Sequence, residues 1–209
     1  MYETIRLIAA TASPRRHAIL RQIGVRDFDV IVPNVEEIHD ATDPIHTVAH
    51  NAAAKFAAAR EMLNAAAAAP FAAPTGAADA RRAAIIAADT LVFFQDRLIG
   101  KPRDIDEARQ FLRDFSGRTQ LVFTAVAMGI ADNSEPELRV EASSVRFKVL
   151  SEEEITSYIQ LVRPLDRAGA YDIDASGDRL IASTNGSYTN IMGLPREVVE
   201  PWLKAAARR

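Results

Sequence analysis

Apolar residues along this chain follow two different spacings, and their order predicts a mixture of strands and helices. Continuous apolar runs of strand length occur at residues 5–10, 28–33 and 84–94. After the first run, Ser13 is a good helix N-cap and Gly24 a good stop, so we expect a helix between them. The chain therefore begins as strand, helix and strand, which is typical of an α/β protein.

Caps and apolar spacing predict further helices. An alanine-rich helix is expected to open at Asp43 and to run to about Asn64. In a capping box, an N-cap side chain and an acid three residues later satisfy each other's backbone N–H groups, and we expect such boxes at 104–107 and 151–154. Pro195 suits the beginning of a last helix.

Two long strands, at 120–131 and 137–150, are expected to pair as a hairpin, and the dipeptide at 185–186, Asn-Gly, is typical of a tight turn. Strands and helices follow one another without strict alternation. We therefore expect a mixed sheet with helices on its faces rather than a doubly wound parallel sheet.

The domain organisation expected from these patterns is simple. A length of 209 residues is enough for one generous domain or two small lobes. Residues 65–83 mix alanine with proline and glycine and show little periodicity. We interpret that stretch as a surface insertion in a single domain that covers residues 1–209.

Composition narrows the function classes. A formal net charge of -3 provides no broad basic field, so we do not expect the chain to bind nucleic acid. No apolar run approaches the roughly 20 residues of a membrane span, and the opening residues lack a secretory signal. The chain has no cysteine, which excludes disulfides and thiolate ligands. A cytoplasmic protein without membrane contact is expected.

Arg15 and Arg16 stand in the first turn of the helix that Ser13 caps. Cations are locally unfavourable there, because the free N–H groups and the helix dipole favour negative charge. The cost disappears if a multiply charged anion docks at this helix end and meets both N–H groups and guanidinium groups. The alternative is that both arginines point into water and pair with distant carboxylates.

Asp89 interrupts a strongly apolar strand, and a buried carboxylate needs a cation, a metal ion or hydrogen-bond donors beside it. The alternative is an acid that caps a neighbouring turn. Lys101 follows in "GKP", where Gly100 and Pro102 restrain the backbone on either side of it. A solvated turn lysine is the alternative reading of this motif.

Glu36 and Glu37 follow the run at 28–33, and adjacent residues point in different directions, so only one of them can join a site. Lys55 stands nearly alone on the alanine-rich helix, where a solubilising role is the alternative. The histidines have no metal-ligand spacing, and no Walker loop, GxGxxG or GxSxG motif is present.

These pieces occur in one order: "ASPRR", "VEE", an isolated helical lysine, "ADT", "GKP", "SGR", "AGAYD" and "NGSYTNIMGLP". That order, over almost the whole chain, resembles the Maf family of nucleoside triphosphate pyrophosphatases. The resemblance implies a mixed, curved sheet with flanking helices, in two lobes around a deep cleft. It also implies hydrolysis of a nucleoside triphosphate to the monophosphate and pyrophosphate with a divalent metal cation, Mg or Mn.

The same resemblance implies a role for each matching residue. Carried over motif by motif, Glu37 helps to hold the metal, and Asp89 binds the metal or takes the proton from the attacking water. The cations Lys55 and Lys101 neutralise the triphosphate. The phosphate-binding residues implied in this way are Ser13, Arg15 and Arg16.

Base preference is implied by three positions. Arg15 and Thr90 match the dTTP/UTP type, whereas Asp174 stands where that type has Gln. An ionised Asp accepts hydrogen bonds but donates none. Further departures are Gln120, where His is common, and Arg167, where Lys is usual.

Other readings remain open at this point. The family name is associated with cell division and septum formation, so a nucleotide-binding regulator without turnover is the alternative to an enzyme. The resemblance further implies a homodimer.

Overall fold

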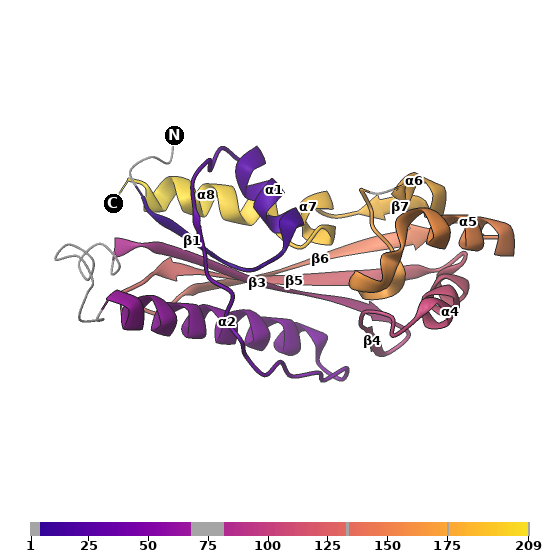
Figure 1. Ribbon diagram of the computed structural model, residues 1–209, viewed down its shortest axis with the longest axis horizontal. Helices are drawn as coiled ribbons and strands as arrows, with labels where there is room; N and C mark the ends of the chain where they lie inside the picture. Colours follow the sequence, from indigo (N-terminus) through magenta and orange to yellow (C-terminus); the bar gives the residue numbers. More distant parts are fainter. Residues whose placement is uncertain (1–4, 68–81, 133, 175, 209) are drawn as a thin grey trace.

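A mixed sheet of seven strands runs the length of the computed structural model, which describes residues 5–67, 82–132, 134–174 and 176–208 (Figure 1). The molecule is elongated along this sheet. Its strands are β1 (Leu7–Ala10), β2 (Asp29–Val30), β3 (Ala84–Phe94), β4 (Arg97–Ile99), β5 (Thr119–Ile130), β6 (Glu137–Phe147) and β7 (Ile181–Asn185).

The strand order is β2-β1-β3-β5-β6-β7, with β4 paired to β3 outside this path. β1 is parallel to both β2 and β3, whereas the pairings of β3 with β5, β5 with β6 and β6 with β7 are antiparallel. The expected mixed sheet and the expected hairpin of two long strands are therefore confirmed. In the β3–β5 register, Thr90 lies opposite Thr124 and Asp89 opposite Ala125.

Helices cover both faces of the sheet, with α2 on one face and α1 and α8 on the other (Figure 1). A further group, containing α4, α5 and α6, lies at the end of the elongated molecule that is far from β1. The helices are α1 (Pro14–Gln22), α2 (Pro44–Ala67), α4 (Ile105–Phe115), α5 (Glu152–Val162), α6 (Gly177–Leu180), α7 (Tyr188–Ile191) and α8 (Arg196–Ala206), with 3-10 turns η1 (Pro164–Asp166) and η2 (Ala168–Ala170).

The two-residue period of β3 divides the core between these faces. Ile85 is buried with Val48 and Phe56 of α2, whereas Ile86 is buried in a cluster with Leu20 of α1 and Leu203 of α8. Further along the same strand, the apolar side chains join a third cluster with α4 and α5. A strand buried on both faces explains why the sequence of β3 is apolar except at Asp89 and Thr90.

The predicted helices are confirmed, with differences at their ends. α2 extends past the expected end at Asn64 to Ala67, because alanine has the highest helix propensity. Most of the predicted insertion at 65–83 lies outside the described residues. The box expected at 151–154 is present: Ser151 N donates to Glu154 Oε2 (2.7 Å) and Glu154 N to Ser151 Oγ (3.2 Å).

Two local expectations are wrong. At 104–107 only half of the box forms: Asp104 accepts from Glu107 N at 2.8 Å, but the Glu107 carboxylate accepts from the N–H of Arg103. The strand expected at 28–33 is confined to the two exposed residues of β2. This short strand lies at the sheet edge, and Pro33 has no N–H with which to extend the ladder.

None of the helices that the structure describes combines the length and the apolar character needed to cross a bilayer.

A candidate anion-binding active site

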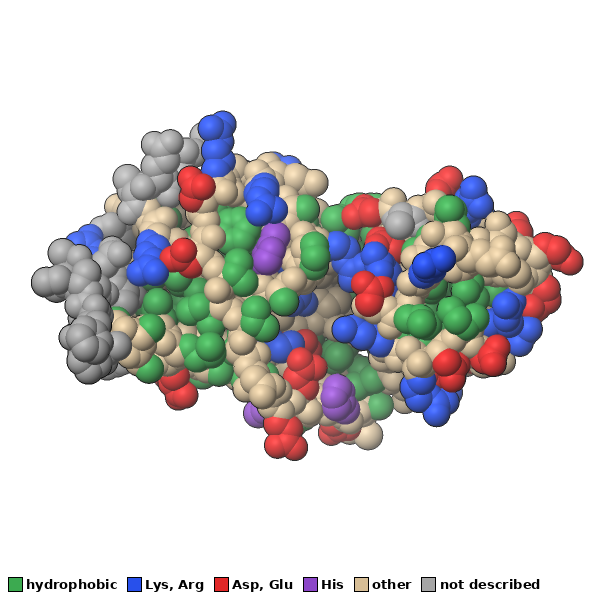
Figure 2. Space-filling model, in the orientation of Figure 1, with side chains coloured by type: hydrophobic (Ala, Val, Ile, Leu, Met, Phe, Trp, Pro, Cys, Tyr) green, Lys and Arg blue, Asp and Glu red, His purple; other side chains and the backbone are tan. Residues whose placement is uncertain are grey.

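A cavity of about 570 Å³ opens midway along the molecule. Figure 2 shows Lys, Arg, Asp and Glu side chains gathered around a hollow at this position. Its walls come from the first turn of α1, from β3, from η1 and η2 with the residues after them, and from the segment before α8. Every site residue predicted from the sequence except Asp174 lines this cavity: Ser13, Arg15, Arg16, Glu37, Lys55, Asp89, Thr90 and Lys101.

Asp89 is only 5% exposed, and its carboxylate is held by two side chains of α2. Lys55 Nζ donates to Asp89 Oδ1 at 2.6 Å, and Asn51 Nδ2 donates to Asp89 Oδ2 at 3.2 Å. Because Asn51 and Lys55 are four residues apart, they project from the same face of the helix. The buried charge on Asp89 therefore has the cation and the donor that its apolar strand required.

Lys55 also joins Asp89 to Glu37, since its ammonium lies 2.7 Å from Glu37 Oε1. Asn51 fixes the segment that carries Glu37: its amide accepts from the N–H of Ile38 at 2.9 Å and donates to the carbonyl of Ile38 at 3.1 Å. One helix thus positions both acids. The sequence reasoning missed Asn51, although a polar residue one turn before Lys55 in an alanine-rich helix was a usable signal.

Arg16 points inward and is held by backbone and hydroxyl acceptors. Its guanidinium donates to the carbonyls of Ala88 and Gly193, both at 2.8 Å, and to Thr90 Oγ1 at 3.0 Å. Thr90 in turn shares a hydrogen bond with Thr124 on β5. Burial lowers the pKa of Arg16, against the opposing effect of nearby Asp89. Arg16 therefore ties α1 to β3 and to the segment before α8.

Arg15 and Lys101 present their charges to the cavity differently. Arg15 is 39% exposed and donates one Nη1 hydrogen bond, at 3.3 Å, to Asp172. Lys101 is exposed and has no hydrogen-bond or ion-pair partner within the described part of the chain. Ser13 lies beside them as the N-cap of α1, its Oγ 3.5 Å from the N–H of Arg16. These cations and the helix end can accept an anion.

The structure does not bring Asp174 into the cavity. Asp174 is exposed, and its Oδ1 accepts a hydrogen bond of 2.6 Å from the hydroxyl of Tyr188. Its contact with a base stays a prediction. Three charged residues of the cavity were not assigned a role from the sequence: Asp172, which is buried, Arg167, which donates to it at 2.6 Å, and Asp166, which also pairs with Arg167.

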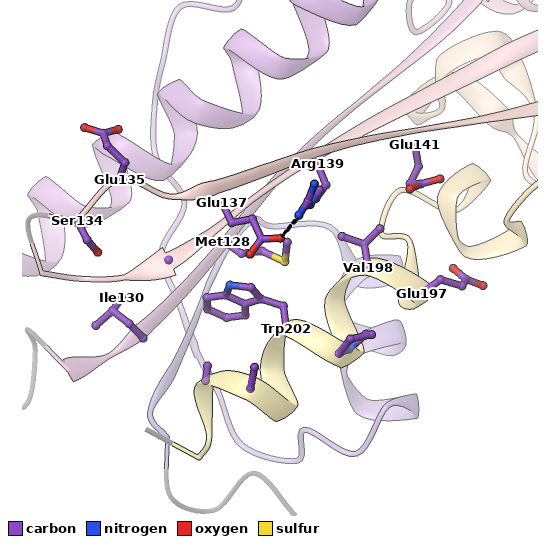
Figure 3. Close-up of a pocket in the computed structure, with 14 residues that line it drawn as sticks. Met128, Ile130, Ser134, Glu135, Glu137, Arg139, Glu141, Glu197, Val198 and Trp202 are labelled. Atoms are coloured by element: carbon purple, nitrogen blue, oxygen red, sulfur yellow. Dashed lines mark hydrogen bonds and ion pairs between the residues drawn. The ribbon is translucent and has the colours of Figure 1, made fainter.

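A second cavity, of about 610 Å³, lies between the β5–β6 end of the sheet and α8 (Figure 3). Trp202 forms one wall, and Arg139 is paired with Glu137 at 2.8 Å. The carboxylates that line it would repel a polyphosphate, so the first cavity is the better anion site. These acids are Glu135, Glu137, Glu141 and Glu197.

Glu37 and Asp89 are the candidate metal ligands in the first cavity. Within the described residues, no group of three or more His, Cys, Asp or Glu is placed to hold a metal ion. Mg²⁺ is commonly bound through one or two carboxylates, with waters and substrate phosphates completing its coordination. The pair of hard oxygen donors, both held by Lys55, fits an ion of that kind.

Comparisons with known proteins agree with this geometry. Residues 6–206 match the family described as Maf-like protein. A dTTP/UTP pyrophosphatase of Dictyoglomus thermophilum is 38% identical over 191 residues, which are 90% of each chain. A protein with the same name from Akkermansia muciniphila is 37% identical over 197 residues, 93% of each chain. Another, from Vibrio parahaemolyticus, is 32% identical over 195 residues, 93% of this chain and 94% of its own.

The family match extends over nearly all of the chain, and the relatives cover it at more than 30% identity. The resemblance inferred from the order of the motifs is confirmed, and the chain belongs to the Maf-like protein family.

Proposed function

We propose that this chain is a nucleoside triphosphate pyrophosphatase that converts dTTP, UTP or modified relatives of them to the monophosphate and pyrophosphate. The observation that carries the proposal is the meeting, in one cavity, of the cations Arg15 and Lys101 with the acid pair Glu37 and Asp89. A triphosphate needs the cations, and activation of water needs a carboxylate. The names of the relatives support the same reaction.

The proposed binding roles follow from which groups retain free donors. Arg15 and Lys101 contact phosphate oxygens, and at the end of α1 capped by Ser13 the backbone N–H of Arg15 can join them, because Pro14 has no N–H and the N–H of Arg16 already faces Ser13 Oγ. Arg16, whose guanidinium is occupied by the carbonyls of Ala88 and Gly193, keeps this helix end beside β3. Its direct contact with phosphate stays a prediction.

The proposed chemical roles centre on the acid pair. Glu37 and Asp89 would hold a divalent cation, Mg or Mn, which when bound neutralises phosphate charge and favours ionisation of water. Asp89 accepts the proton of the water that attacks the α-phosphorus. The new bond joins that water oxygen to the α-phosphorus, and the bond to the bridging oxygen of pyrophosphate breaks. Lys55 and Lys101 stabilise the charge that develops on the leaving group.

The experiment is a substrate panel. The purified protein is incubated with magnesium or manganese and with dTTP, UTP, CTP, GTP, a modified pyrimidine triphosphate or 7-methyl-GTP, and released pyrophosphate is measured. We expect dTTP and UTP to be hydrolysed fastest. A Glu141→Gln variant, altered in the acidic cavity of Figure 3, serves as the matched control and should retain the wild-type rate. If no pyrophosphate is released from any nucleotide of the panel, the proposal is contradicted.

Multiple turnovers in this assay also decide against the alternative of a septum regulator that binds nucleotide without hydrolysis, an alternative that the names of the relatives do not favour. The homodimer, the cytoplasmic location and the single two-lobed domain rest on the family resemblance and on default expectation, and stay predictions. Light scattering during size-exclusion chromatography tests the dimer.

A further inference from the structure

Asp172 is a buried acid in the wall of the anion cavity, to which no role has been assigned so far. It is 5% exposed, and its carboxylate is fully engaged. Oδ2 accepts from Arg167 Nε at 2.6 Å and from Arg15 Nη1 at 3.3 Å, and Oδ1 accepts from the N–H of Asp174 at 3.0 Å. Burial alone would raise the pKa of Asp172, but these hydrogen bonds and charges outweigh it and lower the pKa, so the group is ionised at neutral pH.

The contact between Arg15 and Asp172 joins opposite walls of the cavity. Arg15 is in the first turn of α1, and Asp172 follows η2, 157 residues later in the chain. Both side chains line the cavity, together with Arg167. The guanidinium of Arg16 already donates to two backbone carbonyls. Of the two arginines in this turn, Asp172 therefore contacts Arg15, the one whose guanidinium these carbonyls do not hold.

The geometry leaves most of the Arg15 guanidinium available. Arg15 donates a single side-chain hydrogen bond, to Asp172, and its other guanidinium N–H groups have no partner within the described residues. The shorter bond to Arg167 shows that Arg167 is the main counter-ion of Asp172. Arg15 can therefore keep its bond to Asp172 while its Nε and Nη2 edge forms a two-point contact with a phosphate group.

We propose that Asp172 is a positioning residue that holds the guanidinium of Arg15 over the cavity for the polyphosphate of the substrate. The proposal rests on the proposed function. A free arginine side chain loses considerable rotamer freedom when it binds, and a side chain held in place beforehand loses less. Arg167, which also pairs with Asp166, makes this hold possible, because it offsets part of the negative charge that Asp172 would otherwise present to the phosphates.

A double-mutant cycle tests the proposal. Asp172→Ala, Arg15→Ala and the double variant are compared for their affinity for inorganic tripolyphosphate and for the non-hydrolysable α,β-imido analogue of dTTP, by calorimetry with magnesium present. The KM and kcat for dTTP are measured in parallel. We expect Asp172→Ala to weaken binding and to raise KM by about twofold to tenfold, with kcat changed far less. In the Arg15→Ala background, Asp172→Ala should have no further effect.

The conservative variant Asp172→Asn retains an acceptor for Arg15 and should restore most of the lost affinity. Asp172→Ser, which keeps a small polar group but has no carboxylate, replaces Asp172→Ala in the cycle if that variant fails to fold, as judged by thermal unfolding. Glu152→Ala removes the acid of an exposed ion pair with Arg113 (2.6 Å) on the α4–α5 surface, and as the matched control it should leave KM unchanged.

Three results would overturn the proposal: tighter phosphate binding in Asp172→Ala, unchanged binding, or an equal loss in both backgrounds. The first would mean that Asp172 competes with the substrate for Arg15, and the last that its role is only structural. Because tripolyphosphate binding does not require hydrolysis, a wild-type protein that is silent in the nucleotide panel refutes the proposed function and still leaves the role of Asp172 open to this measurement.

Discussion

The ammonium of Lys55 lies 2.6 Å from the carboxylate of Asp89, and both side chains are largely buried. Lys55 reaches Asp89 from α2, across the face of the sheet, and it also contacts Glu37. A single lysine therefore keeps two acids together. Breaking a buried pair of this kind is costly mainly because the remaining charge loses its counter-ion.

Lys55→Met is therefore expected to destabilise the protein by about 3 kcal/mol, because Asp89 keeps a buried charge without its counter-ion. Urea unfolding followed by circular dichroism measures the change. The double variant Lys55→Met with Asp89→Asn removes both charges and should recover part of the loss. A double variant that is less stable than Lys55→Met would show that the charge of Asp89 is not the cause.

Asp89→Asn is expected to lower kcat for dTTP by at least about 100-fold, because an amide cannot accept the proton of the attacking water. Affinity for the α,β-imido analogue of dTTP should stay much closer to that of the wild type than kcat does, since the amide is similar in shape and its one oxygen can still accept from Lys55. Pyrophosphate release and calorimetry measure the two quantities. An Asp89→Asn variant with an undiminished rate would remove Asp89 from the reaction.

Metal affinity should depend on the nucleotide. Glu37 and Asp89 supply only two carboxylates, and both are held by Lys55, so we expect weak binding of Mn²⁺ to the protein alone. Bound triphosphate adds oxygen ligands and offers Lys55 another anion. Titration of Mn²⁺ by electron paramagnetic resonance should show at least about tenfold tighter binding with the α,β-imido analogue of dTTP present. Equal affinity with and without the analogue would contradict this coupling.

The two neighbouring arginines of α1 provide a matched pair. Arg16→Lys is expected to destabilise the protein by about 2 kcal/mol, because an ammonium cannot satisfy the carbonyls of Ala88 and Gly193 with the planar geometry of a guanidinium. Arg15→Lys, on the exposed side of the same turn, should leave stability within about 0.5 kcal/mol of the wild type and weaken substrate binding instead. Thermal unfolding and KM separate the two effects. Equal loss of stability in both variants would contradict this division.

Local patterns were sufficient to predict most of the elements of this fold. The helix cap at Ser13, the capping box at 151–154 and the apolar run at 84–94 each depend on residues close together in the chain, and all three appear in the structure. The order of the motifs was likewise enough to identify the family. Where the local pattern misled, at 28–33, the outcome depended on a place at the sheet edge that periodicity does not contain.

Contacts between residues far apart in the chain decided which partner each cavity residue binds. Arg15 and Arg16 are adjacent and chemically identical, yet one faces carbonyls of β3 and of the segment before α8 while the other faces Asp172 across the cavity. None of these three acceptors, on Ala88, Gly193 and Asp172, lies near the two arginines in the chain. Short-range spacing can show that an arginine is out of place at a helix N-terminus, but the acceptor that each one meets depends on the tertiary contacts that close the cavity.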